Sequence, residues 1–257
     1  MLNKNTLFVG KVFIEFEALP STNNYAVELI SKSEPTEGTV ISASYQSAGR
    51  GQIGSKWESE AGKNLMFSLI LYPSFLPLTE QFLLSQAIAL GIRDFLSTIV
   101  PQAVYVKWPN DIYIENNKVA GILIQTAISG QSLQYCVAGI GINVNQETFP
   151  TGLPNPVSLK LAASKTFVLP ELIQESFSYL EQRYLQLKAG AYQQLKADYL
   201  NVLYGHQQKV LLKRASGSIF TGVIKGISAN GQLEVESAFG MEAFQLKEVS
   251  LVRLLNE

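Results

Sequence analysis

The chain has 257 residues, of which 47% are hydrophobic and 16% charged, and its formal net charge is −1. This balance suits one large domain, or a large and a small one, and it gives no indication of a nucleic-acid-binding surface. The sequence contains no run of about 18 apolar residues that could cross a membrane, and no signal-peptide core. The single Cys136 and single His206 exclude an internal disulfide and the usual zinc sites, so we expect a cytoplasmic protein.

The first part of the chain predicts a strand followed by a helix. Apolar side chains alternate over residues 12–17, and a helix is expected over 24–33. The polar segment between them, residues 21–23, reads S-T-N. Because hydroxyl groups satisfy free N–H groups at the start of a helix, Ser21 or Thr22 is expected to cap it. Taken alone the segment indicates a cap, and the functional alternative is that its side chains face a ligand.

A glycine-rich loop at residues 49–57, G-R-G-Q-I-G-S-K-W, separates two predicted strands at 39–45 and 65–72. Glycine lets a backbone approach a ligand closely and offer its N–H groups to an anion. The spacing also matches the dinucleotide-binding pattern G-x-G-x-x-G, but no helix opens here and residues 65–73 contain no acid. We therefore reject a dinucleotide site and expect a small phosphate-bearing ligand. A flexible surface loop with chance glycines is the structural alternative.

The middle of the chain predicts a core helix and then a broken strand. Apolar spacing predicts an amphipathic helix over 79–100. The strand that begins at residue 104 is interrupted by Pro109, which cannot donate to a ladder. Asn110, beside this break, can donate and accept at once, as the recognition of an adenine edge or a ribose requires. An Asx turn made by Asn110 and Asp111 is the structural alternative.

Two further strands are predicted at 118–125 and 133–144. Lys118 opens the first of them and is either a point cation aimed at an anion or a lysine that reaches solvent at a hairpin end. The second ends with G-I-G-I-N at 139–143, whose alternate glycines leave one face bare. Such a face admits a flat ligand or another backbone, although a simple bulge would also explain it.

The last third of the chain changes from helices to short strands. Helices are predicted at 170–188 and 192–203, and an Asn-Gly hairpin turn lies at 230–231 among short alternating segments. We expect two domains: a large domain at residues 1–205 and a small β-domain at 206–257 that resembles an SH3 fold.

Five segments, in this order, resemble the biotin–protein ligase family. They are S-T-N at 21–23, Gln46 with the loop at 49–57, K-W-P-N-D at 107–111, K-V-A-G-I-L at 118–123 and G-I-G-I-N at 139–143. The resemblance covers nearly the whole chain and begins almost at its start, so we expect the short form without an N-terminal DNA-binding domain. It implies an α+β fold: a mixed or antiparallel sheet flanked by helices, as in class II aminoacyl-tRNA synthetases, with a small C-terminal SH3-like β-barrel.

The resemblance implies that biotin is activated with ATP to biotinyl-5′-AMP and transferred to a lysine of a biotin carboxyl carrier protein. Mg²⁺ would arrive with ATP, and no metal ligand is assigned. This chemistry needs charge stabilisation and exclusion of water more than an acid–base pair, which agrees with a site without Cys or His. Neither nucleic acid nor a membrane is an expected partner, and the protein could be a monomer or a homodimer.

The resemblance also implies roles for single residues. Lys118 and Arg50 would be catalytic, with Lys118 bridging the biotin carboxylate and the α-phosphate. The biotin-binding residues would be Ser21, Thr22, Asn23, Gln46, Arg50, Gly51, Gln52, Lys118, Gly121 and Leu123. The residues that bind ATP and the adenylate would be Arg50, Gly54, Trp57, Lys107, Asn110 and Asn143. Among these, Trp57 would stack on adenine and Lys107 would face phosphates.

The loop departs from the fuller family pattern, which has arginines where Gln52 and Ser55 stand, so charge alone should hold the adenylate less tightly. Its length and glycine content predict that it is mobile when empty and orders over the adenylate. Two other functions are considered: a lipoate–protein ligase or octanoyl transferase, and a non-catalytic biotin-binding sensor. The K-W-P-N-D segment and the glycine-tryptophan loop speak against the first, and retention of Lys118 and Arg50 speaks against the second.

Overall fold

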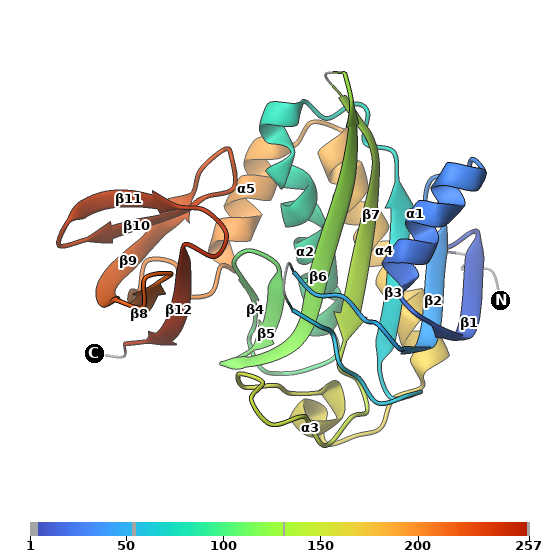
Figure 1. Ribbon diagram of the computed structural model, residues 1–257, viewed down its shortest axis with the longest axis horizontal. Coiled ribbons are helices and arrows are strands. Elements are labelled where there is room, and N and C mark those ends of the chain that lie inside the picture. Colours follow the sequence, from blue (N-terminus) through green and yellow to red (C-terminus); the bar gives the residue numbers. More distant parts are fainter. Residues whose placement is uncertain (1–4, 53–54, 131, 256–257) are drawn as a thin grey trace.

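The computed structural model describes residues 5–52, 55–130 and 132–255. These residues form a larger part built on a seven-stranded sheet and a smaller part built on a five-stranded sheet (Figure 1). Helices flank the larger sheet, so the α+β class expected from the sequence is confirmed. No helix among the described residues is long and apolar enough to span a membrane.

The larger sheet is mixed. Its strands lie in the order β1 (Phe13–Leu19), β2 (Val40–Gln46), β3 (Leu65–Leu71), β7 (Ser132–Ile142), β6 (Asn117–Ser129), β5 (Asp111–Ile114) and β4 (Val104–Lys107). The pair β1–β2 is parallel because α1 (Thr22–Lys32) forms the crossover between them, and every other neighbouring pair is antiparallel. The long hairpin β6–β7 therefore lies at the middle of the sheet, next to the wholly buried β3.

The two faces of this sheet are covered differently. On one face α2 (Phe82–Ser97) and α4 (Leu169–Lys188) pack over the core, with α5 (Tyr192–Asn201) beside them (Figure 1). On the other face α1 covers β2, β3 and β7 through a small cluster formed by Ala26, Ile41, Ile70 and Val137. All seven residues of β3 are buried, and its mostly apolar sequence is typical of a strand that is covered on both faces of the sheet. The remaining part of the second face, over β6 and β5, carries no helix (Figure 1).

The smaller sheet follows α5. Its strands are β8 (Lys209–Arg214), β9 (Ile219–Ile227), β10 (Leu233–Ser237), β11 (Gly240–Phe244) and β12 (Val249–Leu254), in the order β11-β10-β9-β8-β12. All neighbouring pairs are antiparallel, as expected for an SH3-like domain. No ladder between described residues joins β11 to β12, so the expected barrel is not closed.

The predicted Asn-Gly turn connects the two parts. Gly231 has a φ of +80°, and a Cβ there would lie 2.4 Å from the ring of Phe82 in α2. Its carbonyl accepts a hydrogen bond from the indole of Trp108 at 2.8 Å. Glycine is therefore required at this position both for its backbone conformation and for the close approach to α2.

The predicted elements differ from the observed ones mainly at their ends. Helix α1 begins at Thr22, and Ser21 is the cap, since its hydroxyl accepts from the N–H of Asn24 at 3.5 Å. The helix expected over 79–100 is divided into a short 3₁₀ turn, η1 (Leu78–Glu80), and α2. Helix α3 (Leu159–Ala163) was not predicted, because five residues are too few to show a period.

A buried carboxylate anchors the beginning of the chain. Glu181 in α4 is 5% exposed and accepts hydrogen bonds from the N–H groups of Leu7, Phe8 and Val9 at 2.6, 2.7 and 2.9 Å. We expect Glu181→Gln to lower the free energy of unfolding by about 1–3 kcal/mol, because an amide leaves at least one of these N–H groups without an acceptor. Urea unfolding measures this loss, with exposed Glu175→Gln as the control. Equal midpoints for the two variants would contradict it.

The thiol of Cys136 is inert in the folded protein. Cys136 is fully buried in β7, and this burial raises the pKa of its thiol to about 12. Only the thiolate reacts with disulfide reagents, so we expect no modification by such a reagent at pH 8 until urea unfolds the chain. Stoichiometric labelling of the native protein within minutes would be inconsistent with this environment.

Candidate functional site

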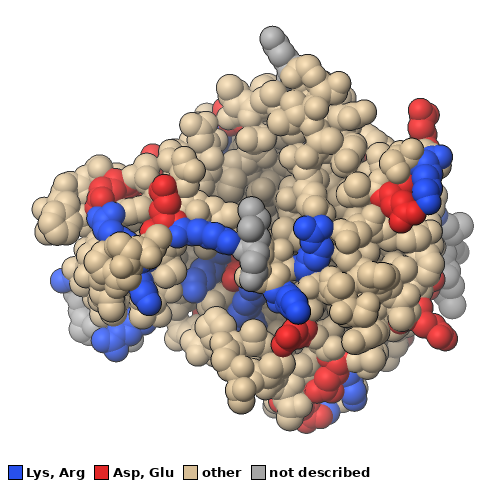
Figure 2. Space-filling model, in the orientation of Figure 1, with Lys and Arg blue, Asp and Glu red and all other residues tan. Residues whose placement is uncertain are grey.

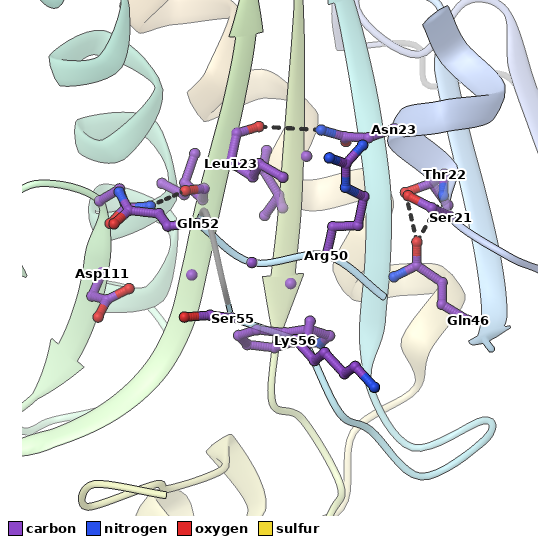
Figure 3. Close-up of a pocket in the computed structure, with 18 of the residues that line it drawn as sticks. Ser21, Thr22, Asn23, Gln46, Arg50, Gln52, Ser55, Lys56, Asp111 and Leu123 are labelled. Carbon is purple, nitrogen blue, oxygen red and sulfur yellow. Dashed lines mark hydrogen bonds between the residues drawn. The ribbon is translucent and has the colours of Figure 1, made fainter. Parts of the chain in front are cut away.

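A cavity of about 210 Å³ opens on the part of the sheet that carries no helix. Its walls are the start of α1, the glycine-rich loop, the segment between β4 and β5, and the facing strands β6 and β7. The lining consists of residues 21–23, 46, 50–52, 55–57, 109–111, 118, 121–123 and 139–141. Figure 3 shows Ser21, Thr22 and Gln46 on one side, Asp111 on the opposite side and Arg50 between them.

The structure brings most of the predicted site residues to this cavity. Every residue expected to bind biotin lines it, as do Trp57 and Asn110 from the set expected to bind ATP. Gly54 lies outside the described residues. Lys107 and Asn143 do not line the cavity.

These two side chains have other partners. The ammonium group of Lys107 donates to the hydroxyl of Tyr113 at 3.1 Å and lies 4.8 Å from the centre of that ring. Burial lowers the pKa of Lys107 below its ordinary value. The amide of Asn143 donates to the carbonyl of Val157 at 3.1 Å and so holds the segment after β7. In this geometry both residues support the walls of the site, and a direct contact with ATP stays a prediction.

The described residues of the glycine-rich loop pair with one another like the arms of a hairpin. The N–H of Trp57 donates to Gly49 at 3.1 Å, and that of Gly51 donates to Ser55 at 3.0 Å. A Cβ on Gly49 would lie 2.4 Å from the carbonyl oxygen of Trp57, so a side chain is excluded there. Glycine is therefore required at position 49 by the close approach of the backbone, and the pairing of the two halves of the loop places Trp57 against the sheet.

The bare face predicted on β7 is occupied by side chains from two other elements. A Cβ on Gly141 would lie 2.4 Å from the indole of Trp57, and one on Gly121 would lie 3.1 Å from it. A Cβ on Gly139 would lie 2.1 Å from the amide oxygen of Asn23. The indole N–H of Trp57 is buried and has no hydrogen-bond partner among the described residues. A buried donor without a partner costs free energy, so a ligand that offers an acceptor to this N–H would gain a favourable hydrogen bond.

Positive charge prevails in the cavity. Among its described lining residues are three cations, Arg50, Lys56 and Lys118, and one acid, Asp111. The ammonium group of Lys118 lies 2.6 Å from the carboxylate of Asp111, and their side chains are 29% and 25% exposed. Figure 2 shows Lys and Arg side chains around the hollow of this face, so the site suits an anion.

Both cations expected to be catalytic are held by acceptors. Arg50 donates to the side-chain oxygen of Asn24 in α1 at 2.8 Å, as Lys118 is held by Asp111. This role of Asp111 was not predicted from the sequence, although its position at the start of β5, which pairs with β6, is a signal that could have placed it near Lys118. A phosphate or carboxylate could exchange with these acceptors as the partner of each cation.

Limited proteolysis tests the prediction that the loop at 49–57 orders over the adenylate. Biotin with ATP should slow tryptic cleavage after Arg50 or Lys56, because a ligand between the loop and the sheet would hold both arms in place. Cleavage after exposed Lys32 serves as the internal control. Equal cleavage of the loop with and without the two ligands would count against this prediction.

The other end of the cavity is polar and uncharged. Gln46 accepts from the N–H of Thr22 at 2.7 Å and from its hydroxyl at 3.2 Å (Figure 3). The hydroxyl of Ser68, in β3, lies 2.5 Å from the amide oxygen of Asn23 and 2.8 Å from the hydroxyl of Thr22. Ser68 was also missed, although a serine within an otherwise apolar strand is a recognisable signal.

The fold and this site are those of an α+β protein whose cavity, cationic on one side and polar and uncharged at one end, suits a small anionic ligand. The model of the biotin/lipoate A/B protein ligase family matches residues 15–143, which include every described residue of the cavity. The chain belongs to this family.

The chain is similar to biotin ligases over most of its length. It is 30% identical over 249 residues to the bifunctional ligase/repressor BirA of Bacillus subtilis, covering 96% of this chain and 76% of that protein. It is 28% identical over 241 residues to the biotin–[acetyl-CoA-carboxylase] ligase of Mycobacterium tuberculosis, covering 90% of this chain and 87% of that protein. The structure of the Aquifex aeolicus biotin protein ligase in complex with biotin and ATP superposes with a TM-score of 0.77 and 26% identity, covering 95% and 99% of the two chains.

Proposed function

We propose that this chain is a biotin–protein ligase, which forms biotinyl-5′-AMP from biotin and ATP and then biotinylates a lysine of a biotin carboxyl carrier protein. One observation carries the proposal: a cavity with an uncharged polar end and a cationic side lies on strands whose glycines make room for the side chains of Trp57 and Asn23. Biotin has a matching shape, with a polar bicyclic head at one end and a carboxylate at the other. The similarity to the Aquifex aeolicus ligase, solved with biotin and ATP, supports it.

In the first step a carboxylate oxygen of biotin attacks the α-phosphorus of ATP. The bond from that phosphorus to the bridging oxygen breaks, and pyrophosphate leaves with the electron pair. Negative charge grows on the phosphate oxygens while two anions are held together. Lys118 and Arg50 would neutralise this charge, with Lys118 between the carboxylate and the phosphate, once the ligand replaces Asp111 and Asn24 as their partners.

In the second step the neutral ε-amine of the carrier lysine attacks the acyl carbon of the mixed anhydride. An amide bond forms, the bond from the acyl carbon to the AMP oxygen breaks, and the amine gives its proton to solvent. Water would destroy the same anhydride. Trp57 lies over Gly121 and Gly141 and, with the loop that carries it, would shield the anhydride until the carrier arrives.

Mg²⁺ accompanies ATP in such reactions, and the cavity offers a carboxylate that could help to hold it. Mg²⁺ is usually held by one or two carboxylates together with substrate phosphates. Asp111 is the carboxylate among the described lining residues, so it would take this part. When bound, the ion would neutralise charge on the leaving pyrophosphate.

The division of labour between the two parts of the chain belongs to the same proposal. Residues 1–205 would carry the chemistry, while residues 206–257 would support it through the contact of Gly231 with Trp108 and Phe82. A cytoplasmic location agrees with a lone, buried thiol.

The first half-reaction gives a direct test. Purified protein with ATP and Mg²⁺ should release pyrophosphate when biotin is added, and not when lipoate is added. Release with lipoate alone would assign the sister activity of the family. Binding of biotin without any release of pyrophosphate would indicate a non-catalytic sensor and would contradict the proposed ligase function.

A further inference from the structure

We propose that Gln125 and Ser68, neither of which lines the cavity, fix the amide of Asn23 in one orientation and thereby make the site specific for a cyclic urea. This inference rests on the proposed function, because the urea is the head group of biotin. Both residues would act through Asn23, so they are positioning residues.

The amide of Asn23 has a defined partner on each side. Its NH₂ group donates to the side-chain oxygen of Gln125 at 3.0 Å and lies 3.4 Å from the backbone carbonyl of Leu123. Its oxygen accepts from the hydroxyl of Ser68 at 2.5 Å. Asn23 is 3% exposed and Ser68 is fully buried, so water does not compete for these contacts. A flipped amide would place its oxygen against two acceptors, which makes the observed orientation the stable one.

This orientation decides what the polar end offers to a ligand. Both N–H groups of Asn23 are taken, so the residue can present only its remaining acceptor lone pair. That oxygen lies over Gly139, whose missing Cβ leaves room for it at the floor of the cavity. Thr22 shares its single hydroxyl proton within the same network, and it too retains a lone pair. The floor therefore consists of acceptors.

Gln46 supplies the complementary group. Its side-chain oxygen already accepts two hydrogen bonds from Thr22, so its NH₂ group is the part left for a ligand. Acceptors from Thr22 and Asn23 with a donor from Gln46 match a cyclic urea, which has two N–H donors flanking a carbonyl acceptor. A dithiolane ring has no such groups and would leave all three side chains without partners. A buried polar group left unpaired discriminates strongly between ligands.

The test replaces Gln125 and measures biotin and lipoate as substrates of the full-length protein. Gln125→Leu removes the acceptor that holds the NH₂ group, so Asn23 can flip and present a donor where the urea also has a donor. We expect the KM for biotin to rise about tenfold, with kcat at saturation and the KM for ATP nearly unchanged. Gln125→Glu keeps an acceptor and should retain the wild-type KM. Gln134→Leu, an exposed glutamine on the neighbouring strand β7, is the matched control.

Two further variants show whether Gln125 acts through Asn23. Ser68→Ala removes the donor on the other side of the amide and should raise the KM for biotin in the same way. In an Asn23→Ala background, Gln125→Leu should have no additional effect, because the group that it positions is gone. The ratio of kcat/KM for biotin over lipoate should fall in Gln125→Leu and recover in Gln125→Glu.

An unchanged KM for biotin in Gln125→Leu and in Ser68→Ala would overturn the inference, as would additive effects in the double variant. Equal losses in kcat and in the KM values for both substrates would indicate a merely structural role and would overturn it as well. Failure of the wild-type protein to use biotin is a different result, because it would remove the proposed function itself.

Discussion

Replacement of Lys118 by Ala should lower the rate of biotinyl-adenylate formation by about 10²–10³-fold, the usual cost of losing one group that stabilises transition-state charge. Lys118 forms an ion pair of 2.6 Å with Asp111 in the cavity, and the next five residues of its strand are buried or line the cavity. Its removal also leaves the carboxylate of Asp111 beside the incoming phosphates, which adds repulsion to the lost attraction.

Single-turnover release of pyrophosphate measures this loss without interference from the carrier. Lys118→Arg should recover only part of the rate, because a planar guanidinium cannot replace a compact ammonium between two anions. Lys160→Ala is the control, since that lysine forms a surface ion pair with Glu147 away from the lining of the cavity. A rate for Lys118→Ala within threefold of wild type would show that the charge is stabilised elsewhere.

Replacement of Gly141 by Val should have the second largest effect, a fall of about 10²-fold in kcat/KM for biotin, as expected when catalytic groups are misplaced by about 1 Å. Even a Cβ at this position would lie 2.4 Å from the indole of Trp57. The strand β7 itself accepts a β-branched residue readily, so the ring and the arms of the loop should move and the strand should stay.

Activity and tryptophan fluorescence together distinguish a displaced ring from a damaged fold. Gly141→Val should change the emission of Trp57 while leaving the thermal unfolding midpoint within a few degrees of wild type. Gly226→Ala is the matched control, because that strand glycine in β9 would meet only a flexible carboxylate oxygen of Glu234 at 3.2 Å. Full activity in Gly141→Val would mean that the bare face of β7 is not part of the site.

The sequence predicted the composition of the cavity because its motifs stand where strands end or pair. The bare face at 139–141, the break at Pro109 and the loop at 49–57 are local features, and each of them lines the cavity. The face of the sheet on which a strand side chain lies was harder to predict. Val104 and Val106 are buried, so Lys107 follows Tyr105 on the other face and meets Tyr113.

Contacts between distant elements could not be read from local patterns. The pair of Asn23 with Gln125 joins residues that are 102 positions apart, and its existence depends on how α1 crosses the sheet. Ser68 did carry a usable signal, as a hydroxyl in an otherwise apolar strand. The amide of Asn143 is taken by Val157, in a loop whose path no periodicity predicts. The missing closure between β11 and β12 likewise depends on how the short strands curve.

Mass spectrometry of a carrier domain after incubation with the protein, ATP, Mg²⁺ and biotin tests the central claim most directly. The account predicts one added biotinyl group on a single lysine, dependent on both small molecules and strongly slowed with the Lys118→Ala variant. An unmodified carrier together with wild-type release of pyrophosphate would limit the chain to adenylate formation. Addition of a lipoyl group under the same conditions, with none of biotin, would contradict the assignment of the cavity.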